Sequence, residues 1–293
     1  RVLQTGSMQR SSKEFRIACE LVRNGVIGKV ERITISIGDP AKPNAYPEEP
    51  KPEGLDWDMW CGPAPLVPFN HELCPVGESK TFPNWRKTRE FGGGMITDFG
   101  AHHIDIAHWG MDAESTGPVE MKNIHGEVPA ATELYNTATK FHFECRYANG
   151  VEMVVADTSE KLMPEVVGNA AAGKNFDHTG IFFEGTDGKW IWVNRDRIAA
   201  SNIDILRQSP KDGEVKLYVS KDHTANFIDC IYSGQATVAP VETAHRTISV
   251  SHLANIALRK GVEQFEWDPK AEKSGNDKVN SLLSREWRKP WSV

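Results

Sequence analysis

The chain has 293 residues, which is enough for one large domain or two domains of ordinary size. It carries 34 Lys and Arg residues against 40 Asp and Glu, a formal net charge of −6 without a basic cluster, which argues against nucleic acid and anionic membranes as partners. No apolar run approaches the ~18 residues of a membrane span. The five cysteines are scattered and form no CxxC pair, which argues against a disulfide scaffold and favours a cytoplasmic location. Composition favours a small polar molecule as the ligand.

The N-terminal part predicts a strand, a helix and a second strand. Val2–Gly6 has the pattern of the end of a buried strand. From Lys13, apolar residues recur at three- and four-residue steps until Gly25 and Gly28, which predicts a helix that ends there. Alternating apolar side chains over Val30–Ile37 predict the second strand.

The segment Asp39–Glu90 differs from the rest because it holds ten of the chain's 17 prolines. Proline at this density prevents regular secondary structure. Trp57, Trp60 and Trp85 nevertheless make the segment too apolar for a disordered linker. We therefore expect an ordered loop that folds over a surface, and long ordered loops of this kind usually serve a function.

The remaining elements alternate between helical and strand patterns. A helix is expected over Met95–Trp109, after the triple glycine Gly92–Gly94. The later patterns predict strands over Val119–His125, Thr137–Tyr147, Val151–Thr158, Gly180–Glu184 and Lys189–Val193, and helices over His223–Ser233 and Glu242–Gly261. The dipeptides Asn149-Gly150 and Asp187-Gly188 are typical of tight hairpins, so the sheet should be antiparallel.

This order of elements predicts an α+β fold, in which a large and mostly antiparallel β-sheet has its helices packed on one face. The chain shows no βαβαβ alternation and no GxGxxG fingerprint. We therefore do not expect it to contain a nucleotide-binding domain of its own.

The helix expected over Met95–Trp109 carries the most informative side chains. On a helical wheel, Asp98, His102, Asp105 and Trp109 fall within a stripe about 60° wide that apolar residues flank. An imidazole one turn from a carboxylate suits proton transfer to or from a hydroxyl, and a second carboxylate and an indole suit a sugar or polyol. The alternatives are a polar pair without a function and a metal site, although further ligands at a recognisable spacing are missing.

These residues resemble the active-site helix of the Gfo/Idh/MocA family, which includes glucose–fructose oxidoreductase and inositol dehydrogenase. The resembling motif is Gly94-x-x-x-Asp98-x-x-x-His102-x-x-Asp105. Further segments of the chain are similar to this family in the same order: Val2–Ser11, Ala18–Val30, Asp56–Pro65, Asn84–Arg86, Asn226–Ile231 and Arg288–Trp291. The resemblance implies a C-terminal domain like those of dihydrodipicolinate reductase and glyceraldehyde-3-phosphate dehydrogenase, in a subgroup of bacterial proteins.

The resemblance also implies a cofactor that this chain does not hold alone. Family members bind NAD or NADP on an N-terminal Rossmann domain and use a lysine from a Glu-Lys-Pro motif, which is absent here. We expect residues 1–12 to be the end of that dinucleotide-binding domain and residues 13–293 to form the domain for substrate binding and oligomerisation. The complete protein would be an NAD(P)-dependent dehydrogenase, and the chain alone should be inactive and bind no cofactor.

The resemblance assigns roles to individual side chains. His102 and Asp98 would be catalytic, with His102 as the acid/base that takes the hydroxyl proton while hydride leaves for nicotinamide, and Asp105 would bind a substrate hydroxyl. The other residues expected near the sugar or polyol substrate are Trp109, Arg10, Gln9, Trp85 and Arg86, with Met8 on the nicotinamide side and no metal ligand.

A homo-oligomer, a dimer or a tetramer, is expected to form through the open sheet. The reason is that Val151–Val155 and Trp190–Trp192 are unusually apolar for strands with a free face. Two other functions remain open: an NAD-dependent glycoside hydrolase of the same family, and a non-catalytic module that binds sugars or supports assembly.

Overall fold

A nine-stranded sheet forms the centre of the chain in the computed structural model, which describes residues 1–38, 42–45, 47–75, 84–170, 176 and 178–292. The described strands follow the order β7-β6-β5-β1-β4-β3-β2-β8-β9 across the sheet. Their bounds are β1 Val30–Ile37, β2 Glu120–Glu127, β3 Lys140–Arg146, β4 Glu152–Asp157, β5 Gly180–Gly185, β6 Trp190–Asn194, β7 Arg197–Ala200, β8 Phe265–Asp268 and β9 Lys273–Ser274.

The sheet is mostly antiparallel, as the hairpin signals predict. Strands β1 and β4 pair in parallel, with Ile33 opposite Met153, while the other strand pairs described are antiparallel. The alternating pattern of β1 sends Ile33, Ile35 and Ile37 to one face, where all three are buried. The predicted α+β class is confirmed.

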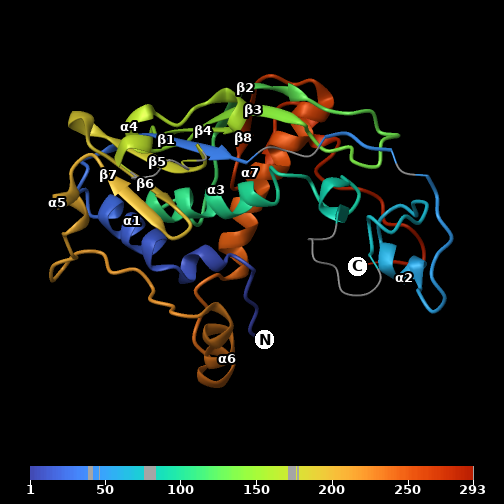
Figure 1. Cartoon of the computed structure of the whole chain (residues 1–293), viewed down its shortest axis with the longest axis horizontal. Coiled ribbons are helices and arrows are strands. Elements are labelled where there is room, and N and C mark those ends of the chain that lie inside the picture. The colour runs from blue at the N-terminus through green and yellow to red at the C-terminus, as the bar shows by residue number, and fades with distance from the viewer. Residues whose placement is uncertain (39–41, 46, 76–83, 171–175, 177, 293) are drawn as a thin grey trace.

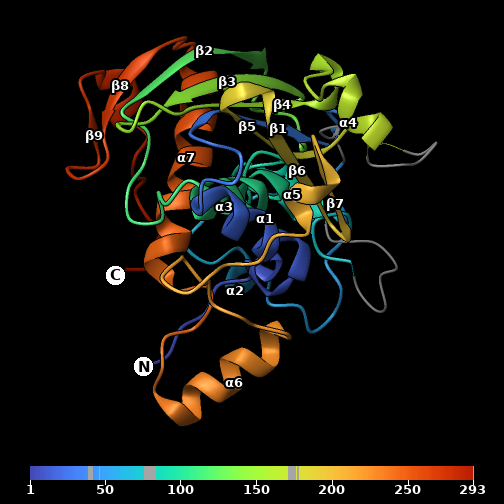
Figure 2. The ribbon, with the colours of Figure 1, turned by 90° about the vertical axis from the view of Figure 1, so that its left-hand side faces the viewer.

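Three helices cover the face to which these isoleucines point (Figures 1 and 2). They are α1 (Lys13–Arg23), α3 (Phe99–Gly110) and α7 (Val241–Lys260), and α3 contacts both of the others. Their apolar side chains and the inner face of the sheet form the main core. None of the described helices is long and apolar enough to cross a membrane.

The opposite face of the sheet also carries a helix, which corrects one expectation. Helix α4 (Glu165–Ala170) lies on this face, so the helices are not confined to one side of the sheet (Figure 2). Its Val167 packs with Trp190 and Trp192, and both indoles are buried within the chain. The tryptophans that suggested an oligomer interface are therefore covered by the chain itself, and the same face carries ion pairs such as that between Lys122 and Glu152. The homo-oligomer stays a prediction.

The Pro-rich segment Asp39–Glu90 builds a small separate core. Its helix α2 (Trp57–Cys61) presents Trp57, which stacks on Trp60 at 4.4 Å between ring centroids and meets Phe69 edge-on. These rings fix the loop through apolar contact, as expected for an ordered loop. Its residues 39–41, 46 and 76–83 lie outside the described residues.

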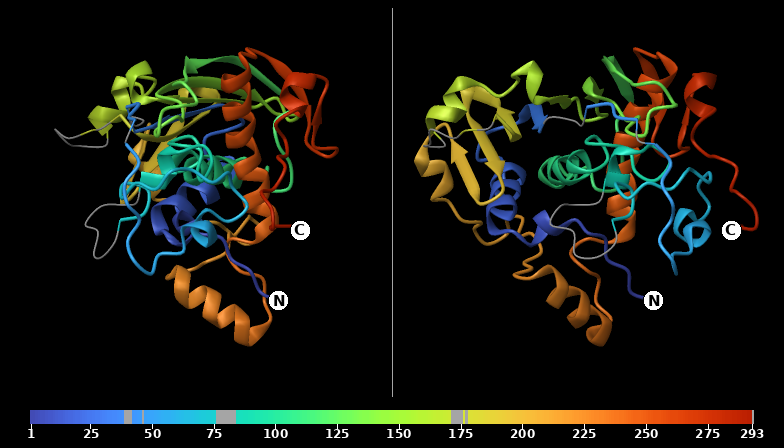
Figure 3. Two further views of the ribbon diagram at one scale, coloured as in Figure 1. Left: turned by 90° about the vertical axis from the view of Figure 1, so that its right-hand side faces the viewer. Right: turned by 45° about the vertical axis from the view of Figure 1, so that its right-hand side comes forward.

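The other described elements are short, apart from α6. They are the 3-10 helices η1 (Met8–Ser11), η2 (Asn84–Lys87), η3 (Thr158–Glu160) and η4 (Thr186–Gly188), and the helices α5 (Ile203–Leu206), α6 (His223–Ser233) and α8 (Asp277–Asn280). The prediction of a strand over Val2–Gly6 is wrong, because this segment has no ladder partner among the described residues, where Thr5 alone donates its backbone N–H, to Ala239. Helix α6 projects from the body beside the N-terminus (Figure 3).

The buried His108 of α3 should make the fold sensitive to acid. Burial, with a smaller contribution from Arg10, lowers the pKa of His108 to about 3, against about 6.5 in an unfolded chain. Below pH 6.5 the unfolded state therefore binds a proton that the folded state does not, and the free energy of unfolding falls with falling pH. We expect His108→Gln to reduce the loss between about pH 7 and pH 5 by about 2 kcal/mol in urea unfolding.

The control for this prediction is His178→Gln, since His178 is exposed. It should keep the pH dependence of the original chain. If His108→Gln keeps that dependence as well, the burial of a neutral His108 is not its cause.

Candidate active site

The helix that carries the candidate residues begins later than predicted. Helix α3 starts at Phe99 rather than Met95, and Asp98 is its N-cap residue with non-helical backbone angles (φ −87°, ψ −90°). The approach to it requires Gly94, which has a φ of +70° and where an added Cβ would lie 2.4 Å from the hydroxyl oxygen of Thr137. Asp98 therefore does not belong to the helical stripe that the spacing indicated.

Asp98 meets Arg86 instead of capping the helix. The carboxylate accepts a hydrogen bond from the Arg86 guanidinium, and both side chains remain about one quarter exposed. Arg86 belongs to η2, so a positively charged side chain of the Pro-rich segment lies at the start of α3. The structure thus brings two predicted site residues together, in a pairing that the sequence did not specify.

His102 lies one turn into α3, half-buried, with charges on several sides. Its ring meets Phe99 edge-on, and the guanidinium of Arg195 lies 4.6 Å from the centroid of the Phe99 ring. Burial, followed by the positive charge of Arg195, lowers the pKa of His102, and Asp98 opposes this shift. At neutral pH the imidazole is therefore uncharged and able to accept a proton.

Asp105 and Arg10 form a buried ion pair beneath His102. The guanidinium donates from Nε to Oδ2 at 2.7 Å and from Nη2 to Oδ1 at 2.9 Å, and the two side chains are 3% and 1% exposed. Arg10 also donates to Glu114 at 2.7 Å and lies 4.9 Å from the centroid of the Trp109 ring. Burial alone would lower the pKa of Arg10, but Asp105 and Glu114 outweigh it and raise the pKa above its ordinary value.

This arrangement divides the predicted substrate ligands into a buried group and an accessible group. Asp105 and Trp109 each contact Arg10 in the interior, and both Asp105 oxygens already have a partner. A contact between Asp105 and a substrate hydroxyl stays a prediction.

The three remaining candidates are split between the interior and the surface. Gln9 is buried and lies 3.3 Å from the imidazole Nδ1 of His103. Met8 and Trp85 are on the surface, with 61% and 36% of their side chains exposed. A contact of Gln9, Met8 or Trp85 with a substrate or a cofactor stays a prediction.

Two residues near the candidate site were not identified from the sequence. Arg195 follows β6 and influences His102, and Glu114 follows α3 and joins Arg10 to Arg23. The charged turn Asn194–Arg197 between two apolar strands was the one available signal for Arg195. Among the residues that the structure describes, no three His, Cys, Asp or Glu side chains gather in a way that could hold a metal ion.

The fold and the helix α3 agree with a protein-family comparison. Residues 21–293 match the family model described as the oxidoreductase family, C-terminal alpha/beta domain. The chain belongs to this family, the Gfo/Idh/MocA oxidoreductases, and the resemblance found in the sequence is confirmed. No curated protein sequence matches the chain.

Solved structures with the same fold include several dehydrogenases. The aldose–aldose oxidoreductase from Caulobacter crescentus, complexed with glycerol, is 14% identical with a TM-score of 0.53 over 91% of this chain and 64% of that chain. The myo-inositol 2-dehydrogenase from Lactobacillus plantarum is 13% identical with a TM-score of 0.52, over 91% of this chain and 65% of that one.

A third structure was solved with bound ligands. The WlbA dehydrogenase from Bordetella pertussis, in complex with NADH and UDP-GlcNAcA, is 12% identical with a TM-score of 0.53. The comparison covers 91% of this chain and 63% of that chain. The chain thus spans less than two thirds of the length of these three proteins, and the likeness at this identity concerns the fold.

The electrostatics at His102 predict opposite effects of two substitutions. Arg195→Gln removes a charge that lowers the pKa of His102 and should raise that pKa, whereas Asp98→Asn removes a charge that raises it and should lower it. In the unchanged chain the midpoint should lie below about 6.5. NMR titration of the His102 ring nitrogens measures all three values.

The two variants serve as controls for each other, since both change one charge near the same ring. Shifts in the same direction, or a midpoint above 6.5 in the unchanged chain, would contradict this account of the site.

Proposed function

We propose that this chain is the substrate-binding and catalytic domain of an NAD(P)-dependent oxidoreductase that acts on a sugar, a polyol or a related hydroxyl compound. The observation that carries the proposal is the environment of His102, a half-buried imidazole with a lowered pKa beside the Asp98–Arg86 pair. The family supports the general class, because its members are oxidoreductases. The solved complexes with glycerol and with a nucleotide sugar support a hydroxyl-rich substrate.

The proposal includes a second domain that holds the cofactor. The described surface near α6 and the N-terminus exposes large apolar side chains, which in a folded protein often mark a contact with another domain: Leu3, Met8, Tyr218, Val219, Ile228, Ile231 and Tyr232. Residues 1–12 would join that domain to residues 13–293.

The described side chains of this chain can contact the nicotinamide ring of NAD or NADP, but they offer no site for the rest of the cofactor. His102 can take a proton and Met8 offers an exposed apolar surface, whereas the sequence has no GxGxxG loop for the pyrophosphate. When bound, NAD or NADP accepts a hydride from the carbon that is oxidised.

The residues of this chain would then act on the substrate hydroxyl. The neutral imidazole of His102 takes the hydroxyl proton as the C–H bond gives up its hydride and a carbonyl forms, and in the reverse reaction the protonated ring returns it. Arg86 holds Asp98 beside the ring, and Asp98 stabilises the imidazolium that the transfer produces. The Arg10–Asp105 pair holds α3 and η1 together beneath the ring.

Substitution of His102 in the longer protein, with its cofactor domain, tests the proposal. His102→Asn should reduce kcat for hydride transfer by about 10²–10⁴-fold, because removal of a general base costs that much. The formation of NADH or NADPH with candidate sugars and polyols is followed by absorbance, and His178→Gln is the control because His178 is exposed. Turnover of His102→Asn within about twofold of the unchanged protein would remove His102 from the mechanism.

The same assay separates the remaining functions. Cleavage of a glycoside without net formation of reduced cofactor would identify an NAD-dependent glycoside hydrolase. Binding of a polyol without any turnover would identify a non-catalytic module.

A further inference from the structure

A groove of about 770 Å³ lies on the side of α7 away from α3. Its walls are the outer surface of α7, the turn at residues 89–93, residues 136–138 and the C-terminal segment 282–285. No member of the His102, Asp98 and Arg86 group lines it, so the groove is distinct from the candidate active site. Its volume is within the range of small-molecule sites.

Three arginines converge at one end of this groove. They are Arg89, Arg259 and Arg285, from three separate segments of the chain. Arg89 donates to the Glu90 carboxylate at 2.8 Å, and Arg285 donates to the backbone carbonyl of Glu90 at 3.1 Å. One carboxylate therefore faces three guanidinium groups, and this end of the groove carries excess positive charge.

Arg259 is the arginine of the three that no hydrogen bond fixes among the described residues, although the charge of Glu90 acts on it. In the part of the chain that the structure describes, no hydrogen bond or ion pair to its guanidinium is formed. Burial of part of the side chain and the neighbouring charge of Arg89 lower the pKa of Arg259, and the Glu90 carboxylate opposes this shift. A bound anion would remove this repulsion.

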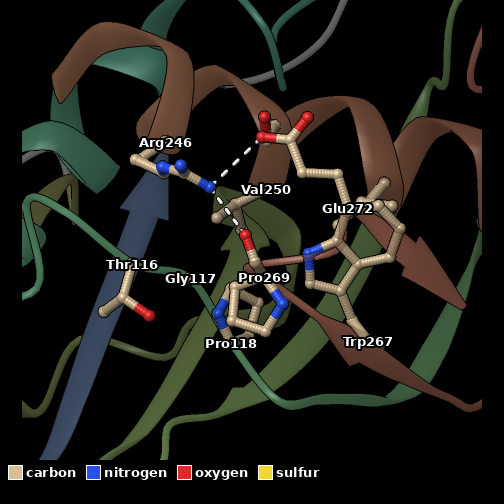
Figure 4. Close-up of a pocket in the computed structure, with 10 residues that line it drawn as sticks. Thr116, Gly117, Pro118, Arg246, Val250, Trp267, Pro269 and Glu272 are labelled. Carbon is tan, nitrogen blue, oxygen red and sulfur yellow. Dashed lines mark hydrogen bonds and ion pairs between the residues drawn. The ribbon is translucent and has the colours of Figure 1, made fainter. Parts of the chain in front are cut away.

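The opposite end of the groove is different, because its acidic group is already neutralised. Glu272 accepts from His245 at 2.6 Å and from Arg246 at 3.2 Å. Arg246 also donates to the carbonyl of Pro269 at 2.6 Å, and Figure 4 shows both contacts of Arg246. A separate small cavity of about 10 Å³ lies beside Trp267, Arg246 and Glu272. The charge available to a ligand is therefore confined to the arginine end.

The middle of the groove has a mixed surface. Phe91, Ile256 and Leu283 contribute apolar contacts, and His252 and Asn255 contribute polar atoms. The Asn255 side chain donates to the carbonyl of Gly93 at 2.9 Å, which fixes the turn against α7. This surface suits the uncharged remainder of a small ligand.

We propose that this groove binds a small molecule through a phosphate or carboxylate group, which Arg259, Arg89 and Arg285 contact together. The planar guanidinium binds both of these groups with paired hydrogen bonds, which explains why three arginines rather than lysines converge here. The remainder of the molecule rests on Phe91, Ile256 and Leu283. This inference is independent of the proposed function, since it concerns other residues and needs no turnover.

Isothermal titration calorimetry of the 293-residue chain at low ionic strength tests the site, with inorganic phosphate, pyrophosphate and citrate as probes. We expect saturable 1:1 binding of at least one probe, weaker at high salt. Arg259→Gln should weaken it at least about tenfold, because Arg259 supplies a charge that no internal hydrogen bond fixes among the described residues. If pyrophosphate binds more tightly than citrate, the site prefers a phosphate group. If citrate binds more tightly, the site prefers a carboxylate.

The matched control is Arg207→Gln, which removes the exposed C-cap arginine of α5, and this arginine pairs only with Asp204 among the described residues. It should bind the probes as the unchanged chain does. The melting temperature of Arg259→Gln should not fall, since the change relieves repulsion with Arg89, and this keeps a loss of binding separate from a loss of folding. Absence of saturable binding, or equal affinity in Arg259→Gln, would overturn the proposal.

Discussion

The buried ion pair between Arg10 and Asp105 is the interaction on which the candidate site depends. It joins η1, near the N-terminus, to the middle of α3, across 95 residues of sequence. Two charges in the interior are costly unless each finds a partner with good geometry, and here both carboxylate oxygens accept from one guanidinium. The pair therefore specifies how α3 and η1 sit against each other, whatever its net effect on stability.

This constraint explains why the polar residues of α3 have two different tasks. Asp105 and Trp109 contact Arg10 in the interior, where they position the helix. His102 and Asp98 lie at the accessible end, where Arg86 and Arg195 set their charge environment. His102, the proposed proton-transfer group, is thus held by a regular helix, while its surroundings come from two distant loops. Such support is what a general base requires for a fixed orientation.

Local sequence patterns predict the long, regular helices and strands. They do not predict the features that depend on contacts between residues far apart in the sequence. The helix His223–Ser233 was predicted with its observed bounds, because its periodicity and flanking residues agree. The strand Arg197–Ala200 and helix α4 were missed because they are short, and α4 explains why Trp190 and Trp192 are buried. Asp98, His102 and Asp105 were found as candidates, but neither the pairing of Asp98 with Arg86 nor the position of Arg195 follows from spacing. Both depend on how separate loops meet α3.

A double-mutant cycle on Arg10 and Asp105 tests the central claim most directly. The free energy of unfolding in urea is measured for the unchanged chain, Arg10→Met, Asp105→Asn and the double variant. The account predicts that each single change is strongly destabilising and that the double variant is less destabilised than their sum by at least about 2 kcal/mol, because each single change leaves a buried partner unpaired. Single effects that add within about 0.5 kcal/mol would contradict it, since the pair would then not hold η1 on α3.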